Sequence, residues 1–292
     1  MKNFIYPFLL ILISCSSAYF CRAEEPAGKN IRFGIVTDPH YADADANGTR
    51  FYRESTSKMA ECVEKMNQEK VSFLVELGDF KDQGKPASEE KTLAFLKTIE
   101  AEFAKFAGPR YHVLGNHDQD SISKKLFLDN VENTGIPKDK SYYSFIKEGI
   151  QFIVLDANFK KDGTPYDHGN FDWKDANVPQ EELDWLKKTL SDHDGKSIVF
   201  IHQRLDSDGD ECVRNSPEIR KALSDSGKVT AVFNGHAHNG GLKKIDGISY
   251  YTLKAMIEKS GPENNSYAIV EVNKDATLKV IGFRKAASAD LK

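Results

Sequence analysis

The chain has 292 residues, of which 40% are apolar and 29% charged. This apolar share is enough for a sizeable folded core, and the charged share suits a soluble surface. The formal net charge is −4 and no basic stripe stands out, so a nucleic-acid backbone is not the expected partner. Mild acidity does not exclude a phosphate ligand, because bound dications reverse the local field.

Residues 1–23 resemble a signal peptide, with basic Lys2 followed by an apolar run over 4–14 that is too short to span a bilayer. Two processing routes remain open. One is cleavage after Ala23. The other is a bacterial lipobox at 12–15, with Cys15 as the lipidated residue. We therefore expect a secreted or periplasmic protein, or one anchored to a bacterial membrane through Cys15, without a transmembrane helix in the mature chain.

The first half of the mature chain alternates between expected strands and helices. Strands are predicted over 31–37, 71–77 and 111–114, and helices over 49–69, 88–106 and 121–131. A hairpin follows over 142–146 and 151–155, and then a long polar loop over 159–178.

The second half is richer in strands. Helices are predicted over 179–191 and from 215 onward, strands over 197–201 and 229–233, and an antiparallel meander over 248–252, 267–272 and 278–283. With no linker or repeat visible, residues 24–292 are expected to form one domain, in which two sheets pack together with helices outside.

Polar residues with metal-binding side chains follow five of these strands. They are Asp38 and His40, Asp79 and Asp82, Asn116, His117 and Asp118, then His202, then His236 and His238. Ligands bind at the carboxyl ends of strands in open α/β sheets. In an extended D-x-H or H-x-H, residues i and i+2 point to the same side, so one strand end can aim two ligands at one site.

The types of side chain indicate which metals would bind. Carboxylate, amide and imidazole together suit Mn, Fe, Zn, Ni or Co. Cleavage after Ala23 leaves Cys62 and Cys212, which either pair or are buried singly, and no CxxC motif supports a thiolate zinc site.

These residues, in this order, are similar to the calcineurin-like metallophosphoesterase superfamily. Its pattern is D-x-H, G-D-x-x-D/N, G-N-H-D/E, a lone His and G-H-x-H, and each element is met between Asp38 and His238. The resemblance implies an α/β (α+β) fold, a four-layer αββα sandwich of two mixed β-sheets flanked by helices. It also implies hydrolysis of phosphoric esters or anhydrides with two divalent metal ions.

The resemblance also assigns roles. Asp38, His40 and His238 would hold the first metal, and Asn116, His202 and His236 the second, with Asp79 bridging both. His117 would be the catalytic residue that protonates the leaving group, with Asp82 to orient it. Two neighbouring cations that share a water lower its pKa toward neutrality, which makes a nucleophile available.

A closer resemblance concerns residues 48–55, GTRFYRES, together with Tyr41-Ala42-Asp43. This stretch looks like a segment of the manganese-dependent ADP-ribose/CDP-alcohol diphosphatases, which implies a small, nucleotide-derived phosphorylated substrate. That group commonly has Gln where this chain has His40, which is the ordinary metal ligand of the superfamily.

Further contacts to the substrate are predicted at several positions. They are Arg50, Arg53 and Arg204 for a phosphate, Tyr166, His168 and Trp173 of the long loop for a pocket wall or nucleobase, and Lys81 for a phosphate unless it is solvated. The rival functions are a broad phosphomonoesterase and a non-enzymatic binding module. The second would require missing metal ligands, and none is missing.

Overall fold

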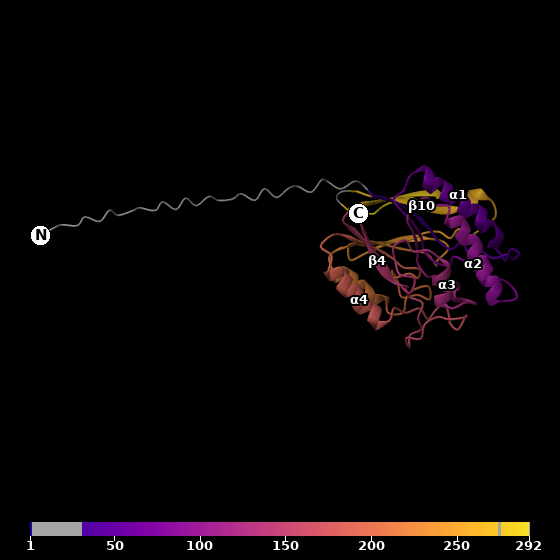
Figure 1. Ribbon diagram of the computed structural model, residues 1–292, viewed down its shortest axis with the longest axis horizontal. Helices are drawn as coiled ribbons and strands as arrows, with labels where there is room; N and C mark the ends of the chain where they lie inside the picture. Colours follow the sequence, from indigo (N-terminus) through magenta and orange to yellow (C-terminus); the bar gives the residue numbers. More distant parts are fainter. Residues whose placement is uncertain (2–30, 274–275, 292) are drawn as a thin grey trace.

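Two packed β-sheets with helices on their outer faces make up the protein, as seen in the computed structural model of Figure 1. The structure describes Met1, residues 31–273 and residues 276–291. The predicted signal peptide and Cys15 lie outside these ranges.

The first sheet combines three parallel strands with an antiparallel extension. In spatial order it contains β12 (Ala289–Leu291), β11 (Leu278–Arg284), β10 (Ser266–Val272), β1 (Ile31–Val36), β2 (Leu74–Glu76) and β3 (Arg110–His112). β1, β2 and β3 run parallel, whereas β10 is antiparallel to β1. The carboxyl ends of β1, β2 and β3 therefore meet at one edge.

The second sheet has a parallel centre with antiparallel strands at both edges. In spatial order it contains β4 (Tyr143–Lys147), β5 (Ile150–Val154), β6 (Ser197–Phe200), β7 (Val229–Asn234), β9 (Ile248–Thr252) and β8 (Gly241–Ile245). β5, β6, β7 and β9 are parallel, and β4 and β8 pair with them in the opposite sense.

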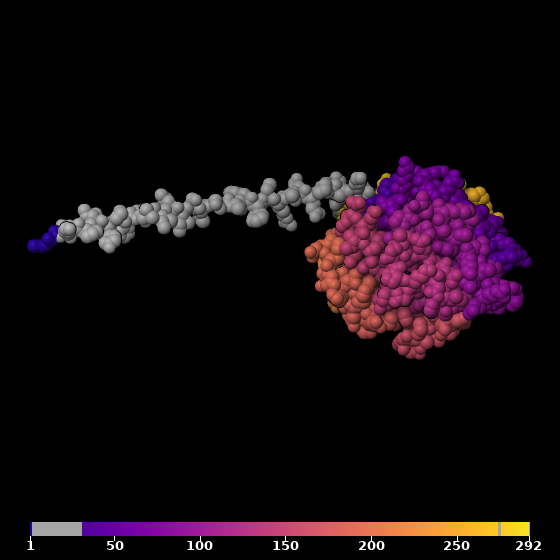
Figure 2. All heavy atoms as spheres, viewed as in Figure 1, coloured from indigo at the N-terminus to yellow at the C-terminus, as the bar shows by residue number. Residues whose placement is uncertain are grey.

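Helices cover the two outer faces. They are α1 (Ser55–Gln68), α2 (Glu89–Phe103) and α3 (Lys124–Asn130) against the first sheet, and α4 (Gln180–Ser191) and α5 (Ser216–Asp225) against the second. Figure 1 shows α1 and α2 on one side of the strands and α4 on the other. In Figure 2 the same N-terminal helices, in purple, and the α4 region, in orange, lie at opposite sides of the face. The predicted four-layer sandwich is confirmed.

An aromatic core joins the two sheets. The rings of Phe33 and Phe73 stack with centroids 4.9 Å apart, and Phe33 also meets the ring edges of Phe152, Phe200 and Phe233. All five side chains are buried. Each contributes about 1.5–3 kcal/mol through removal from water. This core fixes the two sheets against each other and so sets the relative position of their strand ends.

Short local signals start the helices. Ser88 and Ser123 cap α2 and α3 by accepting hydrogen bonds from the backbone N–H groups of Lys91 and Leu126. The first predicted helix is divided, because a short 3-10 turn, η1 (Tyr52–Glu54), precedes α1.

The predicted C-terminal meander is wrong in part. β9 belongs to the second sheet, where it runs parallel to β7, whereas β10 and β11 pair in the first sheet. The strands β8 and β12 are further elements that the sequence pattern does not predict. β8 was missed because it is an exposed edge strand with Lys243 and Lys244, without the apolar alternation that marks a half-buried strand.

Two smaller expectations have definite outcomes. Cys62 and Cys212 are both free and buried, so they do not pair. Among residues 31–273 and 276–291, no helix combines the length and apolar character needed to cross a bilayer.

Candidate metal centre

The five polar clusters of the sequence meet where the carboxyl ends of the two sheets converge. Asp38, His40, Asp79 and Asn116 follow strands of the first sheet, and His202, His236 and His238 follow strands of the second. The donor atoms of the six carboxylate and imidazole residues among them form adjoining groups within 4.8 Å, and Asp79 belongs to more than one of these groups. The site therefore exists only because the two sheets are packed face to face.

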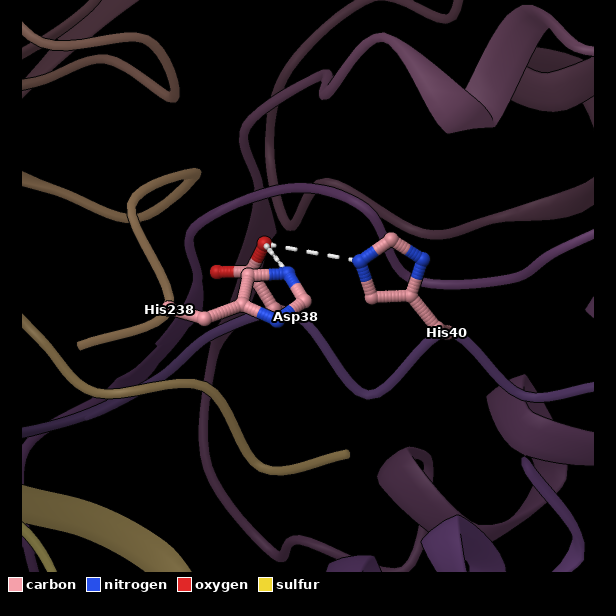
Figure 3. Close-up of side chains that lie close together, drawn as sticks. All are labelled: Asp38, His40 and His238. Carbon is pink, nitrogen blue, oxygen red and sulfur yellow. Dashed lines mark ion pairs between the residues drawn. The ribbon is translucent and has the colours of Figure 1, made fainter. Parts of the chain in front are cut away.

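The first group of donor atoms surrounds one carboxylate oxygen. Asp38 Oδ1 lies 3.6 Å from His40 Nε2 and 3.5 Å from His238 Nε2, and Figure 3 shows this oxygen facing both rings. Ligands that each lie about 2.1 Å from one ion are roughly 3–3.5 Å apart. The three atoms thus have a separation that suits a shared cation.

The second group is built around Asp79. Its Oδ2 lies 3.1 Å from His202 Nε2 and 3.4 Å from His40 Nε2. His236 completes this group, with its donor atom within 4.8 Å of those of Asp79 and His202. Because one oxygen of Asp79 adjoins imidazoles from both groups, Asp79 is placed to bridge two ions.

Several buried oxygen and nitrogen atoms that could ligate a metal at the centre have no hydrogen-bond partner in the protein. They are Asp38 Oδ1, His40 Nε2, Asn116 Oδ1, His202 Nε2 and His236 Nε2. An unpaired buried polar atom costs about 1–3 kcal/mol, and a fold rarely leaves five of them side by side. Divalent cations satisfy all of these lone pairs at once, so the donor set fits two metal ions.

Outer partners fix the direction of the imidazoles. His202 Nδ1 donates to the backbone oxygen of Leu77 at 2.8 Å, which leaves Nε2 for the centre. His238 Nδ1 lies 2.6 Å from Glu258 Oε1, and the hydrogen bond to His238 lowers the pKa of Glu258 to about 2. Such partners orient a ligand and raise its basicity. Glu258 was not predicted, because it lies on a loop twenty residues downstream without a motif.

Four of the proposed ligands have a left-handed backbone. Asp38, His40, Asp79 and His236 have φ of 51°, 44°, 55° and 65°. This region is costly for residues with a Cβ and is concentrated at functional sites. The ligands themselves therefore carry part of the unusual backbone at this site.

Glycine is required where the strand ends touch. A Cβ on Gly115 would lie 2.1 Å from the backbone nitrogen of Asp79, and one on Gly235 would lie 2.6 Å from Asp38 Oδ2. The Gly115 loop is further held by Asp118, whose carboxylate accepts hydrogen bonds from Gly115, Asp79 and Phe80. These contacts bring the β2 and β3 ends close enough to share one centre.

Charge in the centre follows from burial and mutual contact. Burial opposes ionisation of Asp38 and Asp79, but the surrounding histidines outweigh it and hold the pKa of each carboxyl well below its usual range. Burial, reinforced by the charge of His202, lowers the pKa of His236 to about 3. Anionic carboxylates beside a neutral imidazole are the forms that bind a metal.

Comparison with known proteins bears directly on this centre. Residues 31–240 match the model of the calcineurin-like phosphoesterases, and this segment contains every proposed ligand. The chain belongs to the calcineurin-like phosphoesterase family. It is a hydrolase of phosphoester or diphosphate bonds that uses two divalent metal ions.

Full-length relatives of this phosphoesterase are similar along most of their chains. The manganese-dependent ADP-ribose/CDP-alcohol diphosphatase of Oryza sativa subsp. japonica is 27% identical, over 89% of this chain and 93% of the relative. A protein of the same name from Arabidopsis thaliana is 25% identical, over 88% and 96%. A dimetal phosphatase from Danio rerio superposes with a TM-score of 0.75 at 20% identity, over 90% and 98%.

His117 of this phosphoesterase lies beside the centre and is 29% exposed. Its Nδ1 is 2.7 Å from Asp120 Oδ2 but 3.9 Å from Asp82 Oδ2. The predicted role of Asp82 therefore needs correction, since Asp120 is the closer partner. Asp82 Oδ2 instead lies 3.5 Å from His40 Nδ1.

The exchange of partners arises from local geometry. His117–Gln119 forms a 3-10 turn, and Asp120 follows it directly, so the i and i+3 side chains lie on one side. The carboxylates of Asp79 and Asp120 overcome the effect of burial and raise the pKa of His117 to about 9. A protonated imidazole suits donation of a proton to a leaving group.

Lys81 is not solvated, so one of the two alternatives predicted for it is wrong. The side chain is fully buried, and its Nζ donates to the backbone oxygen of His117 at 2.5 Å. Lys81 therefore holds the backbone of the turn that carries His117.

The predicted arginine contacts have different surroundings. Arg53 is 53% exposed and pairs with Asp43 and Asp45, and it borders a cavity of about 430 Å³ that also contains Asp82. Arg50 is half-buried, and its backbone pairs with Glu258.

Arg204 is engaged within the protein. Its guanidinium makes a two-point ion pair with Asp206 at 2.8 Å and a second pair with Glu211 at 3.3 Å. A phosphate would have to compete with these carboxylates.

The three residues predicted from the long loop, Tyr166, His168 and Trp173, differ in their burial and in their neighbours. Tyr166 is fully buried and stacks on Phe171, so the prediction that it walls a pocket is wrong. His168 is exposed and lies between Glu89 and Asp167. Trp173 is exposed close to His236.

Proposed function

We propose that this phosphoesterase hydrolyses the diphosphate linkage of a nucleotide-derived substrate and uses manganese as its metal. Support comes from the full-length similarity to the plant diphosphatases and from a ligand set of carboxylate, amide and imidazole, which suits Mn²⁺. The donor groups that share Asp79 carry the proposal, because they would hold two cations beside one another.

The segment that resembles these diphosphatases adjoins the metal centre. Tyr52 and Arg53 border the same cavity as Asp82, which contacts the proposed ligand His40. A substrate whose phosphates reach the centre would thus have Arg53 and its acidic partners along one side. His40 departs from the Gln common in that group, and it supplies an imidazole nitrogen at a separation that suits metal binding.

The residues of the chain divide the work as follows. The seven ligands would hold the two cations, with Asp79 between them. When bound, these cations supply Lewis acidity, which offsets charge on the phosphoryl oxygens and acidifies water. His117 stands beside Asp79, whose Oδ1 accepts a hydrogen bond from the His117 backbone N–H at 2.8 Å. Its imidazole would give a proton to the leaving oxygen while Asp120 holds Nδ1.

A substrate panel tests this function against a broad phosphomonoesterase. With Mn²⁺, we expect ADP-ribose and CDP-choline to have kcat/KM values at least about tenfold above those of p-nitrophenyl phosphate and its bis ester. Asp79→Ala is the matched control, and it should lose metal and activity together. Preference for the monoester would contradict the proposal, and two retained ions in Asp79→Ala would refute the bridging role.

We further propose that residues 1–23 direct export, on the strength of their basic start and apolar run. Mass spectrometry of the mature protein would find an N-terminus at Glu24 after ordinary cleavage, or a lipidated Cys15 after lipobox processing. An intact Met1 on the exported or membrane fraction would contradict both routes.

A further inference from the structure

A large apolar side chain lies unprotected next to the metal centre. Trp173 is 42% exposed, and its ring centroid is 5.8 Å from that of His236, with the planes tilted by 55°. An exposed aromatic ring of this size offers a flat apolar face on which another ring can stack. Its place beside a proposed metal ligand suggests a ligand that covers it.

The loop around Trp173 is tied down on both sides. Tyr166 stacks on Phe171, and its hydroxyl donates to the backbone oxygen of Asp172. After Trp173, the backbone oxygen of Ala176 accepts a hydrogen bond from the backbone N–H of Arg214, which lies between β6 and α5. The indole is therefore presented by fixed backbone, which reduces the entropy lost when a ring packs on it.

The partly exposed imidazoles indicate where a substrate enters. His117, His236 and His238 each retain some exposure, whereas Asp38, His40 and His202 are buried. Trp173 lies on the His236 side of this opening. A ring attached to a phosphate at the centre would have the indole within reach.

We propose that Trp173 is a stacking platform for the nucleobase of the substrate. The inference rests on the proposed function, because it assigns the base-binding part of the same site. Stacking of a base on an aromatic side chain is worth several-fold to about a hundredfold in affinity and tolerates different bases. The platform would thus accept both purine and pyrimidine nucleotides.

A neighbouring cation favours a neutral ring over a quaternary ammonium group on this platform. Lys174 Nζ lies 5.2 Å from the Trp173 ring centroid and is held by Asp210 at 3.0 Å. A fixed ammonium repels a second cation at the same ring.

Intrinsic fluorescence provides a binding test independent of turnover. The chain has two tryptophans, and Trp185 lies on α4 against Tyr142. In Trp185→Phe, Trp173 is the only indole. We expect AMP and CMP to quench its emission saturably, and ribose 5-phosphate and phosphocholine to leave it unchanged. Equal quenching by ribose 5-phosphate, quenching by phosphocholine alone, or no response to either nucleotide would overturn the proposal.

Steady-state kinetics of Trp173 variants provide a second test of the stacking platform. Trp173→Ala should lower kcat/KM for ADP-ribose by about 10- to 100-fold and leave that for glycerol phosphate unchanged, and Trp173→Phe should restore most of the loss. Trp185→Phe serves as the matched control, with both substrates unaffected. An equal loss on glycerol phosphate would assign Trp173 a structural role instead. Nucleotide quenching without hydrolysis would keep the platform and reject the proposed function.

Discussion

At the scale of single residues, the metal centre is defined by atoms that lack a partner. The unpaired oxygens and nitrogens of Asp38, Asn116 and His202 have no structural use in the protein alone. By contrast, the second nitrogens of His202 and His238 are already bonded to Leu77 and Glu258. Each imidazole is therefore oriented before a metal arrives, which favours tight binding.

The two carboxylates beside His117 give a sharp residue-level prediction. Asp120→Asn should lower kcat by about 10- to 100-fold with the metal content unchanged, because Asp120 contacts His117 and no proposed ligand. Asp82→Asn should mainly weaken metal affinity, by about tenfold, because Asp82 faces His40. Steady-state kinetics and metal analysis of both variants check this.

The comparison of these two variants is its own control, since both remove one charge near the same ring. If Asp82→Asn lost more turnover than Asp120→Asn while fully loaded, Asp82 would be the partner of His117 after all.

Residue-level prediction from sequence succeeded where spacing alone determines direction. The D-x-H and H-x-H pairs and the positions at strand ends predicted that the ligands converge, and the six carboxylate and imidazole ligands do lie together. It failed where a partner depends on a turn or on a distant loop, as with Asp120 and Glu258. Tyr166 failed for a related reason, because the sequence of a long loop does not reveal which aromatic faces inward.

At the scale of elements, α4 contains a buried carboxyl group, that of Glu182, which lowers the free energy of unfolding by an amount that depends on pH. Glu182 Oε1 accepts a hydrogen bond from the Asp156 backbone N–H, and Oε2 has no partner. Burial, together with the nearby charge of Asp156, raises the pKa of Glu182 well above its usual value. A carboxyl group whose pKa is higher in the folded state weakens folding at any pH above its unfolded pKa.

Glu182→Gln should remove this cost while its amide oxygen keeps the Asp156 hydrogen bond. We expect the variant and the wild type to have equal free energies of unfolding near pH 4. Above that pH, the free energy of unfolding of the variant should exceed that of the wild type by a further amount of about 1.4 kcal/mol per pH unit, until the pKa of Glu182 in the folded state is reached. Urea unfolding at several pH values measures the gap. Glu181→Gln, an exposed neighbour on the same helix, is the control and should show no growing gap. A constant gap for Glu182→Gln would contradict the prediction.

The prediction of elements from sequence was best for buried strands and amphipathic helices. β1, β5, β6 and β7 are mostly apolar segments whose residues are largely buried, and α1 buries a stripe of Met59, Cys62, Val63 and Met66. The order of strands in space was harder to predict, because β9 and β10 follow each other in sequence but belong to different sheets. Local pattern cannot specify that crossing, whereas the family resemblance implied the layers.

At the scale of the whole molecule, two bound cations would join the two sheets, because each sheet supplies part of the ligand set. Metal removal should therefore lower the melting temperature. At a metal concentration about a hundredfold above Kd, binding contributes roughly 2.7 kcal/mol, which corresponds to about 5–10 °C for a chain of this size. Calorimetry with Mn²⁺ and after chelation measures the shift.

Asp79→Ala provides the reference for that experiment, because its melting temperature should respond weakly to either treatment. A wild-type protein that melts at the same temperature with and without metal would show that the ions do not hold the sheets together.

The division of the ligands between the sheets also constrains the order of events during synthesis. A growing polypeptide displays Asp38, His40, Asp79 and Asn116 more than eighty residues before His202 emerges, and His238 is later still. A nascent chain that has formed only the first sheet therefore has an incomplete set of metal ligands. Complete loading waits until the second sheet has been made and has docked, which makes metal uptake one of the last steps of maturation rather than a seed for folding.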